Sequence, residues 1–154
     1  MSLKRGKDIP EEDHVVRYVP FSKQIIINDE VVGLYPHAFT LREVEKAGEK
    51  ISVSWLEYFG SPAAVQLTKI KEALANGMNR GKLGANALLA IGNTGQIKSV
   101  CSAFEKPVRI AYSPSSSNPA HSTINHLPID DMHPLFDALA TEAFTELVAV
   151  SDIL

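Results

Sequence analysis

Several short stretches of the chain alternate apolar and polar residues with a period of two. Ile51, Val53 and Trp55 alternate with Ser52 and Ser54, which is the pattern of a strand with one buried face. Other short stretches are dense in β-branched and aromatic residues, as strands are. Further strands are therefore predicted at residues 14–19, 24–27, 31–34, 38–41, 87–91 and 108–112.

Two longer segments instead repeat apolar residues every three or four positions, as one face of a helix does. The first is 61–76, where Ser61 is a candidate N-cap, Pro62 suits the first turn and Gly77 suits the C-terminal end. The second is 134–149, whose apolar repeat runs through its whole length. Two segments stay less regular: 96–104 fits a helix or a strand, and the proline- and serine-rich segment 113–128 predicts a long loop.

Residues 1–12 have few apolar side chains to bury and predict a flexible N-terminal tail. Residues 13–154 show no repeat and no boundary in composition, so they predict a single globular domain. Closely spaced strands, with one helix in the middle and one at the end, are typical of the α+β class. We therefore expect a mostly antiparallel sheet covered by two main helices, at about 61–76 and 134–149.

The composition is that of an ordinary globular domain, with 154 residues of which 45% are apolar and 21% charged. A chain of this length folds without a disulfide or a structural metal, and its lone Cys101 has no internal partner. No apolar run is long enough to span a membrane, the first ten residues lack the apolar stretch of a signal peptide, and no Asn-X-Ser/Thr acceptor occurs. These features predict a cytoplasmic protein that does not bind membranes.

Charge is distributed unevenly along the chain. All 15 Lys and Arg residues lie in the first 109 positions beside 12 acidic residues, a net charge of +3. The last 45 positions hold six acidic residues and no basic one, a net charge of −6. One interpretation is a basic surface for an anionic ligand in the middle of the chain. The other, which we favour, is an acidic helix that packs beside a basic one and pairs with it.

The sequence contains no complete nucleotide or metal motif. Residues 77–83 have the glycines and lysine of a phosphate-binding loop at the wrong spacing, and they lack the hydroxyl that would bind magnesium. The turn at 92–95 could offer backbone N–H groups to an anion if a helix began at Gln96, and a hairpin turn accounts for it equally well. Five His and one Cys show no zinc-ligand spacing, so neither a metal nor a cofactor is predicted.

Two polar segments combine reactive side chains with the ends of predicted elements. In the first, His14 follows an acidic residue and lies on the opposite strand face from Arg17. The imidazole could act as a general acid or base, and the guanidinium could bind a carboxylate or a phosphate. In the second, two prolines stiffen the loop that contains Asn118, His121 and Ser122. Such a loop is typical of side chains held in place for catalysis or ligand binding.

A cleft shared by His14 and His121 would allow acid–base catalysis of hydrolysis or phosphoryl transfer, with Arg17 holding an anion. Polar residues around Trp55 could contribute to the same cleft: Ser52, Ser54 and Glu57. The opposing interpretation, which we favour, is structural. In it, Asn118 and Ser122 make turn hydrogen bonds and His121 satisfies a loop carbonyl.

The segment 58–109 is basic and could bind phosphate groups. It lacks the interleaved aromatic residues of a single-strand binding platform, and the chain as a whole is acidic. A protein partner or a second copy is therefore preferred to nucleic acid. Candidate ligand contacts in this segment are Lys69, Lys71, Arg80 and Lys82. A further hypothesis is self-association through the aromatic residues Trp55, Tyr58 and Phe59.

Three segments together resemble a group of small uncharacterised bacterial proteins: Asp13-His14-Val15, Ile51-Ser52-Val53-Ser54-Trp55-Leu56-Glu57 and Asn118-Pro119-Ala120-His121-Ser122. The resemblance spans most of the chain and implies no activity, cofactor or fold. The leading hypothesis is a small intracellular binding or accessory module for a protein or anionic partner. The alternative is a hydrolase or phosphoryl-transfer enzyme that uses His14 and His121, and the sequence leaves open whether the protein is an enzyme.

Overall fold

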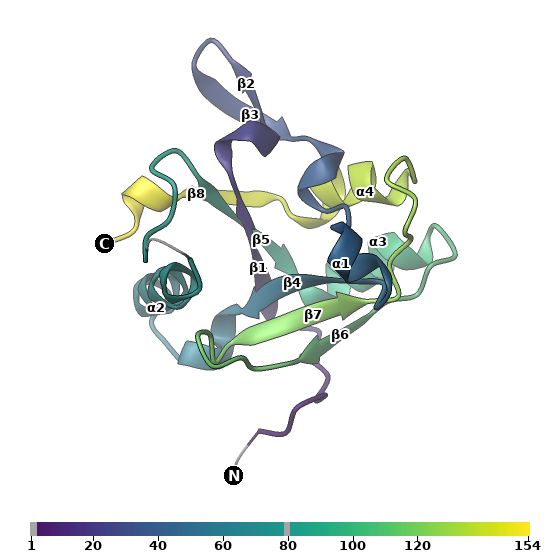
Figure 1. The fold of residues 1–154 in the computed structure, drawn as a ribbon, viewed down its shortest axis with the longest axis horizontal. Coiled ribbons are helices and arrows are strands. Elements are labelled where there is room, and N and C mark those ends of the chain that lie inside the picture. Colours follow the sequence, from purple (N-terminus) through teal and green to yellow (C-terminus); the bar gives the residue numbers. More distant parts are fainter. Residues whose placement is uncertain (1–2, 79–80) are drawn as a thin grey trace.

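Six strands form one antiparallel sheet in the computed structural model, which describes residues 3–78 and 81–154. Across this sheet the order is β6 (Arg109–Tyr112), β7 (His121–Asn125), β4 (Lys50–Trp55), β1 (His14–Val19), β5 (Leu88–Asn93) and β8 (Glu146–Ala149). A separate two-stranded hairpin is made of β2 (Gln24–Ile27) and β3 (Glu30–Leu34). Figure 1 shows the hairpin standing away from the sheet at one end of the molecule.

Helices cover both faces of the six-stranded sheet (Figure 1). α3 (Thr94–Ser102) and α4 (Leu135–Ala138), which η4 (Leu139–Ala143) continues, pack on what we call the first face. α2 (Ala63–Asn76) packs on the second face. The remaining short elements are η1 (Phe21–Lys23), η2 (Pro36–Ala38), α1 (Glu43–Lys46), η3 (Leu56–Phe59) and η5 (Val150–Asp152).

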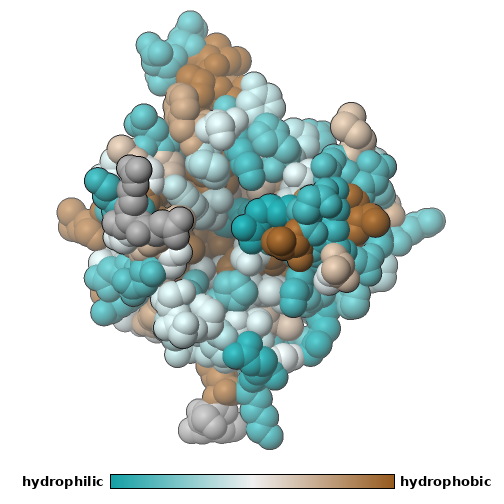
Figure 2. Space-filling model, in the orientation of Figure 1, coloured by the Kyte–Doolittle hydropathy of each residue, from teal (hydrophilic) through white to brown (hydrophobic). Residues whose placement is uncertain are grey.

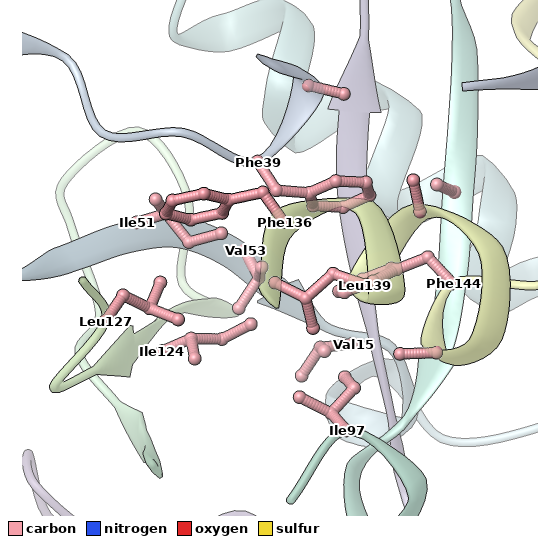
Figure 3. Close-up of a cluster of buried hydrophobic side chains, with 14 of the residues drawn as sticks. Val15, Phe39, Ile51, Val53, Ile97, Ile124, Leu127, Phe136, Leu139 and Phe144 are labelled. Carbon is pink, nitrogen blue, oxygen red and sulfur yellow. The ribbon is translucent and has the colours of Figure 1, made fainter. Parts of the chain in front are cut away.

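The two faces of the sheet bury separate hydrophobic clusters. The larger cluster lies on the first face, where Phe136 and Phe144 are buried together with Val15, Val53 and other strand residues (Figure 3). The ring centroids of Phe39 and Phe144 lie 4.7 Å apart in this cluster. In the smaller cluster, sheet residues pack against Ile70 of α2. Burial of side chains on both faces is the main source of the fold's stability.

The predicted fold class is confirmed: the chain is a single α+β domain built on an antiparallel sheet. The strands predicted at 14–19 and 24–27 have the bounds of β1 and β2. The helix predicted at 61–76 is α2, and Gly77 is its C-cap. Its N-cap is Pro62 rather than Ser61. No helix among the described residues is long and apolar enough to cross a membrane.

The helix predicted at 134–149 is wrong in its second half. Helical turns end at Ala143, and the chain then runs as β8 beside β5. Leu147 packs against the cluster on the first face and Val148 against the cluster on the second. Both residues fit a helical repeat, but pairing with β5 satisfies backbone groups of both strands and buries side chains on two faces.

Two other segments differ from their predictions, and the segment with two open alternatives follows one of them. The predicted loop 113–128 contains β7. The predicted strand 38–41 begins with Ala38, the last residue of the helical turn η2, and pairs with no strand of the described chain. The undecided segment 96–104 is largely helix, because α3 spans Thr94–Ser102. β7 forms a strand although its sequence does not alternate apolar and polar residues. It lies between β4 and β6, and pairing with both strands outweighs the weak strand preference of its residues.

The segment predicted as a flexible tail packs along β6 from Gly6 to Ile9. The backbone N–H of Gly6 donates to the oxygen of Tyr112 (2.7 Å), and that of Ile9 donates to the oxygen of Ile110 (3.0 Å). Ile9 is only 1% exposed. This one apolar side chain and the backbone pairing hold the segment against the sheet.

Candidate functional site

The second face of the sheet changes from apolar to polar between β1 and β7. Val16 of β1 pairs with Ser54 of β4, and Ser54 pairs with His121 of β7, so these residues form one row on this face. At the apolar end of the row, Val16 packs in the cluster beneath α2. At the other end lies the polar patch, which we define as Ser52, Ser54, Asn118 and His121.

His121 makes a hydrogen bond through each of its ring nitrogens. Nδ1 lies 2.7 Å from the backbone oxygen of Ser113, and Nε2 lies 3.0 Å from Oγ of Ser52. A carbonyl oxygen can only accept, which assigns the proton of the neutral ring to Nδ1. Nε2 is then the acceptor for the hydroxyl proton of Ser52. The patch therefore contains a serine hydroxyl that donates to an oriented imidazole.

Asn118 attaches the loop before β7 to β4. Its Nδ2 donates to Oγ of Ser54 (2.9 Å), and its Oδ1 accepts from the backbone N–H of Ala120 (3.0 Å). Its own backbone N–H donates to Oγ of Ser115 (3.1 Å). Asn118 is 6% exposed, so these bonds replace bonds to water. The loop that supplies Ser113 to His121 is thus fixed at a second point.

A cavity of about 110 Å³ opens beside the polar patch, which lines it together with residues of β1 and Leu74 of α2. It lies where β1 and β4 separate, because the pairing of these strands ends at Val16 and Ser54. Hydroxyl, amide and imidazole groups on one side and apolar atoms on the other suit a small ligand with a polar end.

Arg17 bridges the gap between the separating strands. Its Nη1 donates to the backbone oxygen of Ser52 (2.8 Å), and its Nε donates to the backbone oxygen of Ala38 (3.1 Å). Burial lowers the pKa of Arg17 from its ordinary value, and the charge of Glu45 opposes that shift. Because these donors serve carbonyl groups, Arg17 positions the backbone of Ser52 instead of binding an anion through them.

His14 does not meet His121. Both its backbone N–H and its Nδ1 contact the carboxylate of Glu57, each at 2.7 Å. In the strand register, His121 lies two strands from Val16, and His14 lies two residues from Val16 along β1. The Cα atoms of the two histidines are therefore about 12 Å apart. The ring of His121 binds Ser52, which lies further from His14 than Ser54 does along β4. The structure therefore gives no support to acid–base catalysis by this pair.

The other candidate ligand residues lie apart from the polar patch. Ser122 lies on the first face, fully buried, and donates to the oxygen of Ala120 (3.1 Å). Lys69 forms an ion pair with Glu72 (3.8 Å) on the surface of α2. Lys71 and Lys82 line a separate cavity of about 490 Å³. Arg80 lies outside the described residues.

The favoured explanation of the charge asymmetry does not match the described contacts. Lys71 contacts the acidic C-terminal part through backbone oxygens of Val150 (3.2 Å) and Ile153 (2.7 Å), not through carboxylates. Within residues 3–78 and 81–154, no ion pair joins the basic segment 69–109 to an acid beyond position 129. Among the described ion pairs, the one that reaches the acidic C-terminal part joins it to Lys46, whose Nζ lies 3.8 Å from Oδ1 of Asp131.

Three further sequence hypotheses concern segments outside the patch. At the turn 92–95, α3 begins at Thr94, and its first backbone N–H groups donate to oxygens of Asp13 (2.9 Å) and Glu11 (3.0 Å). Trp55 is 6% exposed and donates to Asp13 (2.9 Å), so it offers little surface for self-association. The described residues contain no group of three or more His, Cys, Asp or Glu side chains that could hold a metal ion.

Comparisons of the chain with protein-family models, with curated proteins and with solved structures find no match.

Proposed function

We propose that the chain is a hydrolase that transfers a short acyl group through Ser52, with His121 as its general base. The observation that carries this proposal is the hydrogen bond from Oγ of Ser52 to Nε2 of His121 (3.0 Å), beside a cavity of about 110 Å³. A serine next to a base that a third group orients is the recurring arrangement for nucleophilic catalysis. Here the third group is the backbone oxygen of Ser113.

The reaction is an ester or thioester hydrolysis in two steps. Oγ of Ser52 attacks the carbonyl carbon while Nε2 of His121 takes the hydroxyl proton. The bond to the leaving group then breaks, and His121 returns the proton to that group. A water molecule, deprotonated by His121, attacks the acyl-serine, and the carboxylic acid leaves as Ser52 regains its proton.

The negative charge that forms on the carbonyl oxygen needs hydrogen-bond donors beside Ser52. Ser54 and Asn118 line the same cavity. The Asn118 amide uses one of its two N–H groups on Ser54, and the Ser54 hydroxyl, which accepts that bond, has its own proton to donate. These two side chains are the donors that we assign to the oxyanion.

The volume of the cavity limits the acyl group. With about 30 Å³ for each water-sized group, a cavity of about 110 Å³ holds roughly four such groups. Acetyl and propionyl groups fit within this volume, whereas a long acyl chain would extend out of the open cavity into water. A neutral carbonyl behind His121 also stabilises the imidazolium less than a carboxylate does, so we expect modest turnover.

The test is the hydrolysis of p-nitrophenyl acetate by the full chain and by three variants. Ser52→Ala and His121→Asn should each lower kcat/KM by about a hundredfold or more, because each removes the nucleophile or its base. His14→Gln is the matched control, since this histidine lies on the same sheet face and away from the cavity. It should leave the rate within about twofold.

Two results would overturn the proposal. One is a Ser52→Ala variant with the rate of the unmodified chain. The other is an equal loss of rate in His14→Gln and His121→Asn, which would indicate unspecific imidazole catalysis. p-Nitrophenyl decanoate provides the size test, and its rate should lie far below that of the acetate.

A further inference from the structure

One edge strand of the six-stranded sheet is covered by another segment of the chain, and the other is not. The edge at β6 is covered by residues 6–9, and the backbone N–H of Tyr112 donates to the oxygen of Lys7 (2.8 Å). The edge at β8 pairs on its inner side with β5. No described segment pairs with its outer side. Uncovered edges are the places where proteins add a strand from another chain.

The outer side of β8 presents its own hydrogen-bonding groups. The backbone N–H of Val150 donates to the oxygen of Ala87 (3.0 Å), and Ala149 pairs with Leu88 in the same register. In an antiparallel ladder the N–H groups of successive residues point to alternate sides. The N–H groups of Leu147 and Ala149 therefore point away from β5, where an added strand would bind them.

Apolar cavities lie beside this edge on both faces of the sheet. Leu147 lines a cavity of about 330 Å³ together with Phe144 and Val32. Val148 lines another, of about 190 Å³, together with Leu67 of α2. These two neighbouring strand residues pack against opposite clusters. An added strand would place alternate side chains on the same two faces, so both cavities are within its reach.

The charged residues near the outer edge of β8 favour a basic partner segment. Glu146 lies in β8 and is exposed, and Asp152 lines the smaller cavity. Neither cavity is lined by a described basic residue, and the nearby Lys71 is bonded to the backbone oxygens of Val150 and Ile153. Since the last 45 positions carry a net charge of −6, two copies paired through β8 would bring like charges together. A cationic segment avoids that repulsion.

We propose that the outer edge of β8 binds an extended segment of a partner protein, in which apolar side chains alternate with polar ones and Lys or Arg flanks them. Backbone hydrogen bonds to Leu147 and Ala149 supply the pairing. The two cavities take alternate apolar side chains, and Glu146 and Asp152 attract the basic ends. This binding is independent of the chemistry assigned to Ser52.

The test is a selection of phage-displayed random heptapeptides on the full chain and on its Ala149→Pro variant. Ala149 has φ −66° and ψ 134°, which proline adopts, and its N–H points outward, so the ladder to β5 stays intact. Ala149→Val is the matched control because it keeps the N–H. Enriched heptapeptides should alternate apolar residues and contain excess Lys or Arg, and they should not be enriched on Ala149→Pro.

Synthetic copies of the enriched heptapeptides then measure the effect by titration. Ala149→Pro should weaken binding by about tenfold and Ala149→Val should not, because only the proline removes a hydrogen bond and blocks the path of the strand. Glu146→Lys should weaken binding by about fivefold at low salt. In the unmodified chain, the amide resonances of Leu147 and Ala149 should shift on peptide addition, which tests the site without a variant.

Enrichment that survives in Ala149→Pro, or peptides rich in Asp and Glu, would overturn the proposal. So would the absence of any enriched heptapeptide. A concentration-dependent dimer in sedimentation, abolished by Ala149→Pro, would instead assign the edge to a second copy of the chain and contradict the proposed partner.

Discussion

The two halves of the second sheet face differ in what covers them. Beneath α2, Val16 and Leu89 are buried against apolar helix residues. Further along the row of Val16, Ser54 lies on β4 and His121 on β7, and their polar atoms bond to neighbouring loop and strand groups. The difference shows that a sheet face can be stable without a helix over it if its polar groups satisfy one another.

The comparison also explains why the reactive groups lie where they do. In the apolar half, α2 packs directly on the strands, and the cavity beside the polar patch reaches this half at its border, at Val16 and Leu74. In the polar half, Ser52 and His121 are only half-buried and line the same cavity. We therefore expect catalysis in the polar half around Ser52 and His121. We expect the free energy of unfolding to depend most on the apolar half beneath α2.

The largest contrast concerns the reactivity of two nucleophilic side chains, Cys101 in the apolar layer of the first face and Ser52 in the polar half. Burial raises the pKa of the Cys101 thiol from 9.0 to about 12. At pH 8, iodoacetamide should therefore alkylate the folded chain about a thousandfold more slowly than the unfolded chain. Mass spectrometry at timed intervals measures both rates.

The same shift makes stability depend on pH. The folded thiol keeps a proton that the unfolded thiol releases above about pH 9, so the free energy of unfolding should fall as pH rises from about 9 toward 12. Cys101→Ala should lack this part of the decline. Equal slopes in the two proteins, from urea titrations at each pH, would contradict the assignment.

The next largest effect compares Leu89→Ala with Ser52→Ala. Leu89 is fully buried beneath α2, so its truncation should lower the free energy of unfolding by about 3 kcal/mol. Ser52 is half-buried, and water can replace its hydroxyl at His121, so its truncation should cost less than about 1 kcal/mol. Urea unfolding measures both, and equal losses would remove the distinction between the halves.

A smaller effect is expected at Asn118. Asn118→Ala leaves the N–H of Ala120 without its partner and removes the donor to Ser54, so it should cost about 2 kcal/mol. It should also lower kcat toward the acetate ester, because it removes a donor assigned to the oxyanion. Asn125→Ala, at the half-buried end of β7, is the control with little expected effect on the rate.

The smallest effect concerns a polar atom within the apolar layer. Oγ1 of Thr94 is buried and has no hydrogen-bond partner in the described chain. Thr94→Val keeps the shape and removes the unsatisfied hydroxyl, so it should raise the free energy of unfolding by up to about 1 kcal/mol. Thr94→Ser keeps the hydroxyl and should not stabilise. A stability loss in Thr94→Val would show that the hydroxyl has a partner after all.

The pattern of apolar and polar residues predicts those elements whose conformation does not depend on distant parts of the chain. The bounds of β1 follow from its β-branched run, and the inward residues of β4 follow from alternation with Ser52 and Ser54. β8 was missed because Leu147 and Val148 also fit a helical repeat. Whether Leu147 and Val148 form a helix or a strand depends on the edge of β5 with which they can pair, and that edge exists only in the folded chain.

The candidate site was predictable only in part. The two prolines indicate a stiff loop that holds Asn118 and His121, and the position of Ser52 beside Trp55 suggests a place in the same cleft. The partner of His121 is 69 positions away in the sequence and reaches it only through the pairing of β4 with β7. His14 had equally suggestive neighbours, but its partner is Glu57. Spacing along the chain cannot distinguish such pairs before the strand order is known.

The most direct test of the central claim is the labelling of Ser52 by a fluorophosphonate, located by peptide mass spectrometry. The unmodified chain should gain one label, at Ser52, because its hydroxyl donates to Nε2 of His121. His121→Asn should remain unlabelled over the same time, and His14→Gln should be labelled at the unmodified rate. Labelling at Ser54 or Ser122 instead, or labelling that persists in His121→Asn, would contradict the assignment of Ser52 as an activated nucleophile.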